Sequence, residues 1–328
     1  MTTSQKGASL GMTHPAIKYE EEAMIKAENL TKVFGDYKAL NNISCTIEEG
    51  CIYGMVGSNG AGKSTFLRLL TGIYKADNGT ITIDGNNIYE NTELKSQMAF
   101  VPDELYFLNS SSMDRMAKLY MSLYKDFSVE RYEHLKESFK LDGKKNMNTF
   151  SKGMKRQAAT ILALSCRPKY LLLDETFDGL DPVMRNLVKT IVCQDVIDRK
   201  ATAILTSHSL RELEDTCDQL ALLHKGGLVL ESDISNLKTS LFKVQVAFTG
   251  EFAHTYGKEI FEGLDMLHYT KHGSVANIIV RGDRNEVTAK IQAKNPVILD
   301  ILPLTLEEVF TYEMEALGYC FDDVLIND

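Results

Sequence analysis

Apolar residues along the chain follow two kinds of spacing, and the way these alternate predicts the architecture. Between residues 24 and 230, short apolar runs such as 52–56 and 170–173 are separated by stretches in which apolar residues recur at helical spacing. Runs of this length, free of polar interruptions, are typical of strands buried on both faces. The alternation therefore predicts an α/β fold with a largely parallel sheet covered by helices.

Two parts of this region depart from the alternation. At its start, strand-like runs are separated by turn residues such as 35–36 and 48–50, which indicates an antiparallel β flank and hence a mixed sheet. These runs are residues 24–30, 39–47 and 80–83. Later, between about 104 and 150, strand-like runs disappear while Met113, Met116 and Leu119 recur at helical spacing. We interpret that stretch as a helical insertion.

The pattern changes again after residue 230. The expected strands are 242–248, 266–269, 276–280 and 297–301, and the expected helices are 257–263, 284–293 and 305–317. Their β-α-β-β-α-β order is that of the split βαβ, or ferredoxin-like, arrangement. We therefore expect three parts: a flexible N-terminal tail at 1–23, a domain at 24–231, and a small C-terminal α+β accessory domain at 232–328.

Composition and charge narrow the class of protein. The 328 residues are 44% hydrophobic and 25% charged, as in ordinary globular proteins, and no apolar run approaches the roughly 18 residues that cross a bilayer. The start lacks a signal-peptide pattern, so a cytoplasmic location is expected. With a net charge of −9 and no basic cluster, we expect no nucleic-acid partner. The six cysteines lack the close pairs of zinc or redox motifs and are interpreted as free thiols.

The strongest motif is G-x-x-x-x-G-K-[ST], which directly follows the apolar run 52–56 and precedes a helical pattern. In this context glycines let backbone N–H groups curl around phosphates, and the helix presents its positive end to the same charge. Lys63 should reach the β- and γ-phosphates, and Ser64 can offer its hydroxyl to Mg²⁺. The predicted ATP-binding residues are Gly57, Ser58, Asn59, Gly60, Ala61, Gly62, Lys63, Ser64 and Thr65.

Two acids, Asp174 and Glu175, end the buried run 170–173. In doubly wound sheets the ligand lies beyond the carboxyl ends of the strands, so both acids should lie beside the phosphates. Asp174 is predicted to hold Mg²⁺, and Glu175 is predicted to act as the general base that polarises the attacking water.

Taken together, the motifs resemble those of the ABC transporter ATPases. The run 174–182 is similar to their Walker B motif and D-loop, and residues 150–154 are similar to their signature motif, over roughly residues 24–231. The resemblance implies a P-loop NTPase of ABC type. It also implies that the signature of one subunit contacts the γ-phosphate bound by the other, that Asp181 is the D-loop acid, and that His208 is the catalytic switch histidine. The predicted signature residues are Ser151, Lys152, Gly153 and Met154.

Some positions depart from the family pattern. Lys152 replaces the usual glycine and Met154 the usual glutamine. Asp103 follows the predicted strand 98–101 and occupies the position where the family usually has a glutamine. We interpret Asp103 as a residue that contacts Mg²⁺. The adenine-stacking aromatic is predicted to be Phe34, with Tyr37 as a substitute.

The resulting function is an ATP-binding and ATP-hydrolysing subunit of an ABC transporter. The resemblance implies that it dimerises around two ATP, as a homodimer or heterodimer, to drive a separate integral membrane permease on the inner face of the cell membrane. The segment 302–310 is similar to the end of ATPase subunits of bacterial exporters, which favours export. The alternatives are a soluble ABC-type ATPase acting on ribosomes or DNA and, more weakly, a small-molecule P-loop kinase.

Overall fold

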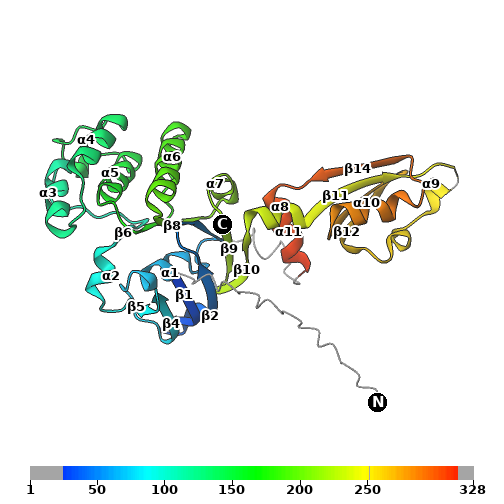
Figure 1. Ribbon diagram of the computed structural model, residues 1–328, viewed down its shortest axis with the longest axis horizontal. Helices are drawn as coiled ribbons and strands as arrows, with labels where there is room; N and C mark the ends of the chain where they lie inside the picture. The colour runs from blue at the N-terminus through cyan, green and yellow to red at the C-terminus, as the bar shows by residue number, and fades with distance from the viewer. Residues whose placement is uncertain (1–24, 251, 317–328) are drawn as a thin grey trace, which may run out of the picture.

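The protein forms three β-sheets with helices packed around them (Figure 1). The computed structural model describes residues 25–250 and 252–316. The tail expected at residues 1–23 lies outside them. No helix in these two ranges is long and apolar enough to cross a membrane.

The central sheet has six strands in the order β10-β9-β3-β8-β7-β6, and all neighbours are parallel except β9 and β10. Its strands are β3 (Ile52–Val56), β6 (Met98–Val101), β7 (Tyr170–Leu173), β8 (Thr202–Ser207), β9 (Gln219–His224) and β10 (Gly227–Asp233). Every residue of β3, β7 and β8 is buried. Successive residues of β3 enter different cores, since Tyr53 and Met55 lie in one apolar cluster and Ile52 and Val56 in another. The prediction of strands buried on both faces is confirmed.

Helices cover both faces of this sheet. They are α1 (Lys63–Leu70), α5 (Lys152–Ser165), α6 (Pro182–Arg199) and the short α7 (Leu210–Glu214). Phe66 and Leu67 of α1 pack with Tyr53, whereas Ile161 of α5 and Val188 of α6 pack in the cluster that contains Ile52. The mixed α/β fold expected from the sequence is confirmed.

The expected antiparallel flank is also present. It is a four-stranded sheet in the order β2-β1-β4-β5, with β1 (Ile25–Phe34), β2 (Tyr37–Ile47), β4 (Asn78–Ile83) and β5 (Asn86–Asn87). Its inward residues, such as Leu40 and Ile43, share a core with α1. The flank therefore packs on the α1 side of the central sheet.

The segment between β6 and β7 is helical, as predicted. It contains α3 (Met113–Leu123), α4 (Val129–Ser138), the single-turn η1 (Met147–Thr149) and then α5, while α2 (Thr92–Ser96) precedes β6. Met113 and Met116 are buried against this group, but Leu119 and Leu123 of the same predicted apolar face are exposed. The helical periodicity was therefore correct, but part of the apolar face does not enter the core.

The C-terminal part forms a third sheet in the order β12-β13-β11-β14, in which all neighbours are antiparallel. Its elements are α8 (Ile234–Ser240), β11 (Leu241–Ala247), α9 (Phe252–Thr255), η2 (Lys258–Phe261), β12 (Asp265–His272), β13 (Val275–Arg281), α10 (Arg284–Gln292), β14 (Ile298–Pro303) and α11 (Leu306–Ala316). The helix expected at 257–263 is only a 3₁₀ turn, because Glu262 leaves the helical region with ψ at 135° and Gly263 follows with φ at 87°. The strand β10 runs to Asp233, so the domain boundary expected after residue 231 falls inside a strand.

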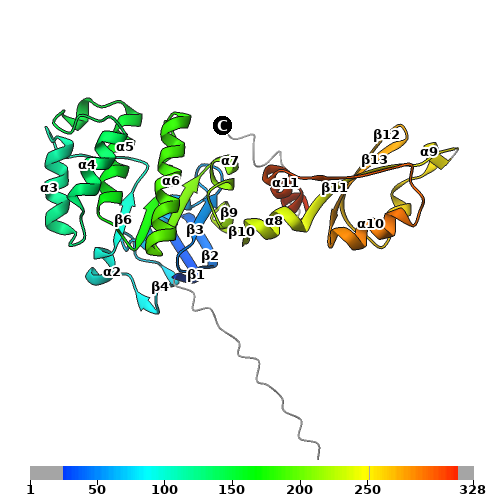
Figure 2. The same cartoon turned by 45° about the horizontal axis from the view of Figure 1, so that its top comes forward.

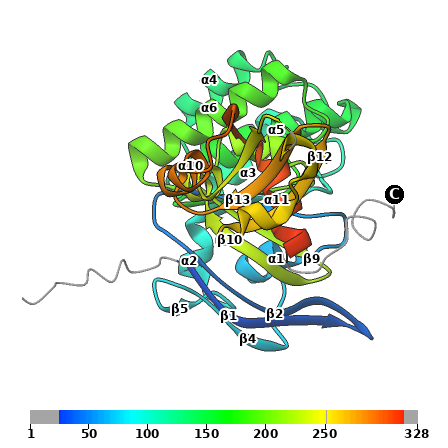
Figure 3. The same cartoon turned by 90° about the vertical axis from the view of Figure 1, so that its right-hand side faces the viewer.

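The last helix returns to the central part of the molecule. Figures 1 and 2 show α11 beside α7 and α8, although the sheet that precedes it extends away from them. Leu306 and Val309 of α11 are fully buried in the same cluster as Leu213 of α7. Viewed along the long axis, the third sheet and α10 lie in front of the central part (Figure 3). The C-terminal sheet is thus connected to the rest of the protein through a packed helix contact as well as through the chain.

Candidate active site

Several of the predicted site residues, among them Lys63, Asp174, Glu175 and His208, meet at the carboxyl edge of the central sheet. Val56 of β3 pairs with Ser207 of β8, and Leu173 of β7 pairs with Leu205 of β8. The residues that follow these strands therefore lie side by side. At this edge lies a cavity of about 180 Å³. Its lining residues are Tyr37, Ala39, Asn59, Gly60, Ala61, Gly62, Lys63, Ser64, Thr65, Asp103 and Glu175.

The loop between β3 and α1 is shaped by close backbone approach. Gly62 has a φ of 107°, and a Cβ there would lie 2.5 Å from Leu40 Cδ2 and 2.6 Å from the carbonyl oxygen of Ala39. Only glycine fits this position. The loop directs Lys63 inward, where its Nζ donates to the carbonyl oxygen of Gly57 at 2.6 Å. The same Nζ lies 3.0 Å from Oε1 of Glu175, and the lysine side chain is 6% exposed.

Asp174 is fully buried beside the start of α1. Its Oδ1 accepts hydrogen bonds from Thr206 Oγ1 at 2.6 Å and from Ser64 Oγ at 3.1 Å. Its Oδ2 is buried and has no hydrogen-bond partner within the described ranges. Burial raises the pKa of this carboxyl above its ordinary value. An unpartnered carboxylate oxygen next to a serine hydroxyl is a donor set that suits a hard cation such as Mg²⁺.

Glu175 lies between a cation and an imidazole. Its Oε1 faces Lys63, while its Oε2 lies 3.0 Å from His208 Nδ1 and accepts from the His208 backbone N–H at 3.2 Å. The backbone of Glu175 is left-handed, with φ at 46°. Such a conformation in a non-glycine residue is uncommon and persists only where the surroundings hold it. The structure therefore brings Lys63, Glu175 and His208 into one hydrogen-bonded group.

The two candidate aromatic residues occupy different places. Tyr37 lines the cavity, and its hydroxyl donates to the carbonyl oxygen of Gly60 at 2.9 Å. Phe34 is not among the cavity-lining residues of the described chain. Its ring packs edge-on against Tyr74 with the centroids 5.3 Å apart, and the Lys32 ammonium lies 5.3 Å from its centroid. Tyr37, the substitute in the sequence-based interpretation, is thus nearer to the phosphate loop.

The signature residues lie at the start of α5, outside the cavity of their own chain. Ser151 caps the helix by accepting from the Met154 backbone N–H at 3.2 Å. Lys152 forms an ion pair with Asp178 at 2.7 Å, and this hydrogen-bonded lysine lowers the pKa of Asp178. At Gly153 a Cβ would lie 2.7 Å from the carbonyl oxygen of Gly179. The signature therefore touches the loop after Glu175, and within the described chain it does not meet Lys63.

Asp181, the predicted D-loop acid, caps the next helix. Its Oδ1 accepts from the backbone N–H groups of Val183 and Met184, both at 3.0 Å. Within one chain it acts as the N-cap of α6, and it does not line the cavity formed by the described residues.

Asp103 lines the cavity, but its carboxylate is engaged by a residue that the sequence reasoning did not include. Its Oδ1 accepts from Nη2 of Arg156 at 2.7 Å. Thr206, which bridges Asp174 and the Glu175 backbone N–H, was missed as well. Arg156 could have been noticed because it falls four residues before Thr160, on the buried face of α5. Thr206 carries no such signal before the register of β7 and β8 is known.

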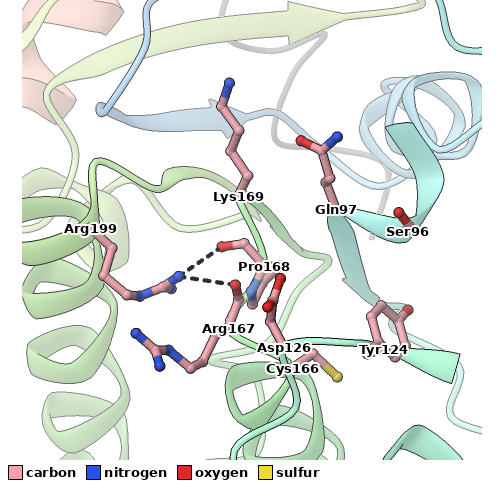
Figure 4. Close-up of a pocket in the computed structure, with 9 residues that line it drawn as sticks. All are labelled: Ser96, Gln97, Tyr124, Asp126, Cys166, Arg167, Pro168, Lys169 and Arg199. Carbon is pink, nitrogen blue, oxygen red and sulfur yellow. Dashed lines mark hydrogen bonds between the residues drawn. The ribbon is translucent and has the colours of Figure 1, made fainter. Parts of the chain in front are cut away.

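A second cavity, of about 270 Å³, lies at the opposite edge of the central sheet (Figure 4). Its lining includes Gln97 and Lys169, which directly precede β6 and β7. Arg199 donates from Nη1 to the carbonyl oxygens of Arg167 and Pro168 at 3.0 and 3.3 Å. Because it lies at the amino ends of the strands, this cavity is separate from the group around Glu175.

Comparison with known proteins gives consistent matches. The sequence profile described as ABC transporter matches residues 40–178. The ABC transporter ATP-binding protein YtrB of Bacillus subtilis is 29% identical over 287 residues, which cover 88% of this chain and 97% of YtrB. The bacitracin transport ATP-binding protein BcrA of Bacillus licheniformis is 30% identical over 220 residues, 66% of this chain and 71% of BcrA. The YtrB match spans 287 residues, which is more than the 231 residues up to the expected domain boundary, so it extends into the C-terminal sheet.

A solved structure shares the fold of the central part. It is described as a dimeric structure of a post-hydrolysis state of the ATP-binding cassette MJ0796 bound to ADP and Pi. It is 19% identical, has a TM-score of 0.57, and covers 64% of this chain and 99% of its own.

Proposed function

The chain belongs to the family of ABC transporter ATP-binding proteins, and from this premise we propose how its residues carry out the function. It is an ATP-binding and ATP-hydrolysing subunit of an ABC transporter. The observation that supports the assignment of roles is the convergence of Lys63, Asp174, Glu175 and His208 at one edge of the central sheet.

The phosphate loop would hold the triphosphate. Backbone N–H groups of residues 57–65 and the N-terminus of α1 supply positive potential, and Lys63 adds a full charge. In the structure that charge is turned toward Glu175 and the carbonyl oxygen of Gly57, at the edge of the same cavity. We assign Tyr37 to the base-binding side of the cavity, with Phe34 as the outer alternative, because Tyr37 lines the cavity.

The metal-binding part of the site would consist of Ser64 Oγ and Asp174 Oδ2. The second of these is a buried oxygen without a hydrogen-bond partner among the described residues, which is the atom a cation would satisfy. A bound Mg²⁺ would neutralise charge on the β- and γ-phosphates. Asp103 lines the same cavity, and we keep it as an outer contributor because its Oδ1 is held by Arg156.

Glu175 would take the proton from the attacking water. As the water oxygen bonds to the γ-phosphorus, the bond from that phosphorus to the bridging oxygen breaks, and ADP leaves with the bonding pair. His208 lies 3.0 Å from the far oxygen of Glu175 and can hold the carboxylate in that orientation. Lys63 stabilises the charge on the transferred group.

The signature would act on a second subunit. Ser151 and Gly153 start α5, a 14-residue helix whose N-terminus favours an anion, yet they lie outside the cavity of their own chain. Two chains facing each other would bring each helix start to the other chain's triphosphate. The MJ0796 cassette is described as dimeric, which supports the same arrangement here.

ABC ATPase subunits work with membrane permeases, and we infer that this chain drives such a permease from the inner face of the membrane. Export is the proposed direction. It is supported by the relative named for bacitracin transport and by the segment 302–310, which is similar to the end of exporter ATPases. The relatives reported above are named for transport, which does not favour the ribosome or DNA alternative.

The test is purification of the tagged full chain from native membranes, with identification of the polypeptides that accompany it. A membrane-spanning protein recovered in a fixed ratio to the chain is expected. The control is the Gly153→Arg variant, in which the signature is disturbed because a side chain at position 153 cannot fit beside the carbonyl oxygen of Gly179. Recovery of ribosomes or DNA in place of a membrane protein would contradict the proposal.

A further inference from the structure

Arg156 is a charge in the protein interior whose contacts connect three motif segments. Its side chain is 1% exposed. Its Nη1 donates to the backbone carbonyl oxygen of Glu175 at 2.6 Å and to that of Asp174 at 3.3 Å. Its Nη2 donates to Asp103 Oδ1 at 2.7 Å. One guanidinium therefore links α5, the end of β7 and the loop after β6.

Asp103 is the counter-charge of the buried Arg156 guanidinium. A buried cation is costly unless it is paired and hydrogen-bonded. Within the described ranges its ion pair is with Asp103, and its Nε has no hydrogen-bond partner there. The Asp103 side chain is 47% exposed and borders two cavities, the one at Lys63 and a second of about 450 Å³ outside it. The loop after β6 is thus anchored in the interior through this pair.

The same guanidinium holds the backbone that carries Glu175. The residue has φ at 46°, a conformation that needs support from its surroundings. Its N–H donates to Thr206 Oγ1 at 3.0 Å, and its carbonyl accepts from Arg156. With both of its backbone polar groups held, the carboxylate is directed to Lys63 and His208. Arg156 lines the outer cavity of about 450 Å³ but, among the described residues, not the cavity at Lys63, so it acts on the site through Glu175.

We propose that Arg156 is a positioning residue for hydrolysis, with Asp103 as its counter-charge: the pair sets the position of the Glu175 carboxylate and so controls the turnover rate. This inference rests on the ATPase function proposed above. It assigns to Asp103 a role toward Arg156 that differs from metal ligation. A planar, bidentate guanidinium suits this role because it contacts carbonyl and carboxylate oxygens at the same time.

The experiment compares steady-state ATP hydrolysis and equilibrium ATP binding in full-length variants Arg156→Met, Arg156→Lys, Asp103→Asn and the double variant Asp103→Asn/Arg156→Met. Arg156→Met should lower kcat by roughly 100-fold, since small misplacements of a catalytic group have effects of this size. ATP affinity should stay within about threefold, as expected when ground-state binding is untouched. Arg156→Lys should recover part of the rate, and the double variant should be no slower than Arg156→Met.

The matched control is Arg131→Met. Arg131 also pairs through Nη2 with an aspartate Oδ1 at 2.7 Å, on Asp195, which is buried and remote from the cavity. This control should lower Tm and leave kcat unchanged. The proposal is overturned if Arg156→Met and Asp103→Asn hydrolyse ATP at the wild-type rate, or if both lose ATP binding together with turnover. A wild-type chain without ATPase activity would instead overturn the proposed function. If Glu175→Gln loses activity while the Arg156 and Asp103 variants keep it, the proposed function stands and only the role of Arg156 is rejected.

Discussion

The central sheet and the C-terminal sheet of this protein differ in whether the residues that follow their strands can gather into one site. In the central sheet, β3, β7 and β8 run in the same direction, so the residues after all three strands collect at one edge. In the C-terminal sheet every neighbouring pair is antiparallel, so strands that lie side by side end at opposite edges. The first arrangement brings Lys63, Asp174, Glu175 and His208 together.

The C-terminal sheet instead has apolar residues on both faces, and Leu241 and Ile279 of one face join the cluster that includes α7. Val244, Ala276 and Ile278 lie in a cluster of their own, and α11 carries the contact back to α7. The helix α7 begins two residues after His208. We therefore propose that the central edge performs the chemistry, whereas the C-terminal unit stabilises the segment that follows His208, the proposed switch histidine. Each prediction below separates these two roles.

The largest expected effect is on chemistry alone. Glu175→Gln removes the proposed general base while keeping the shape of the side chain, so turnover should fall by roughly 10²- to 10⁴-fold. ATP binding should persist, and the variant should accumulate as an ATP-bound dimer, measured by light scattering with and without nucleotide. Sustained hydrolysis in this variant would show that Glu175 is not the general base. It would also contradict the proposal that the central edge performs the chemistry.

The next effect is on stability alone. Leu306→Ala removes a fully buried side chain from the contact between α11 and α7, and should cost about 2–5 kcal/mol in the free energy of unfolding. Denaturant unfolding measures this cost. At a temperature where the variant remains folded, its kcat should match the wild type within about twofold, because no cavity-lining residue changes. A large loss of kcat in folded protein would mean that the C-terminal unit takes part in catalysis.

A pH experiment sharpens the comparison at the central edge itself. Burial raises the pKa of Asp174, so its contribution to the stability of the nucleotide-free protein is fully present below the ordinary carboxyl pKa and is lost as pH rises through the raised folded value. Asp174→Asn should therefore have a higher Tm than the wild type at pH 7, and the difference should shrink toward pH 4.

Asp178 is the control, because its pKa is shifted in the direction opposite to that of Asp174. The hydrogen bond from Lys152 lowers its pKa, so its stabilising contribution is present above the ordinary carboxyl value and is lost as pH falls through the lowered one. Asp178→Asn should lower Tm at pH 7. Equal pH profiles for the two variants would contradict the assignment of a desolvated carboxylate to Asp174.

The smallest effect is expected at the rim of the α7 and α11 contact. Arg211 and Glu307 pair at 3.0 Å, but both side chains are largely exposed. Arg211→Met should change the free energy of unfolding by only about 0.2–1 kcal/mol, because solvent and salt screen such pairs. Thermal unfolding at low and high salt measures it. A loss as large as that of Leu306→Ala would show that the ion pair, and not apolar packing, holds the C-terminal unit.

Much of the fold followed from local patterns. The buried strands β3 and β7 and the helices α1 and α3 were predicted from short runs whose spacing or composition admits few alternatives. The helix expected at 257–263 was wrong, because its flanking glycines and short length leave a single 3₁₀ turn. The conformation of a short element depends on what packs against it, and that information is not contained in its own seven residues.

The sequence by itself determined the parts of the site that are contiguous. A glycine loop between a strand and a helix must present N–H groups and Lys63 in one direction, and two acids at the end of a buried strand must emerge at its carboxyl edge. Only the tertiary structure decided that Arg156 holds Asp103, that Thr206 bridges Asp174 and Glu175, and that α11 packs on α7. The physical reason is that these contacts join residues distant in the chain, whose proximity is set by strand register and side-chain packing and leaves no local pattern in the sequence.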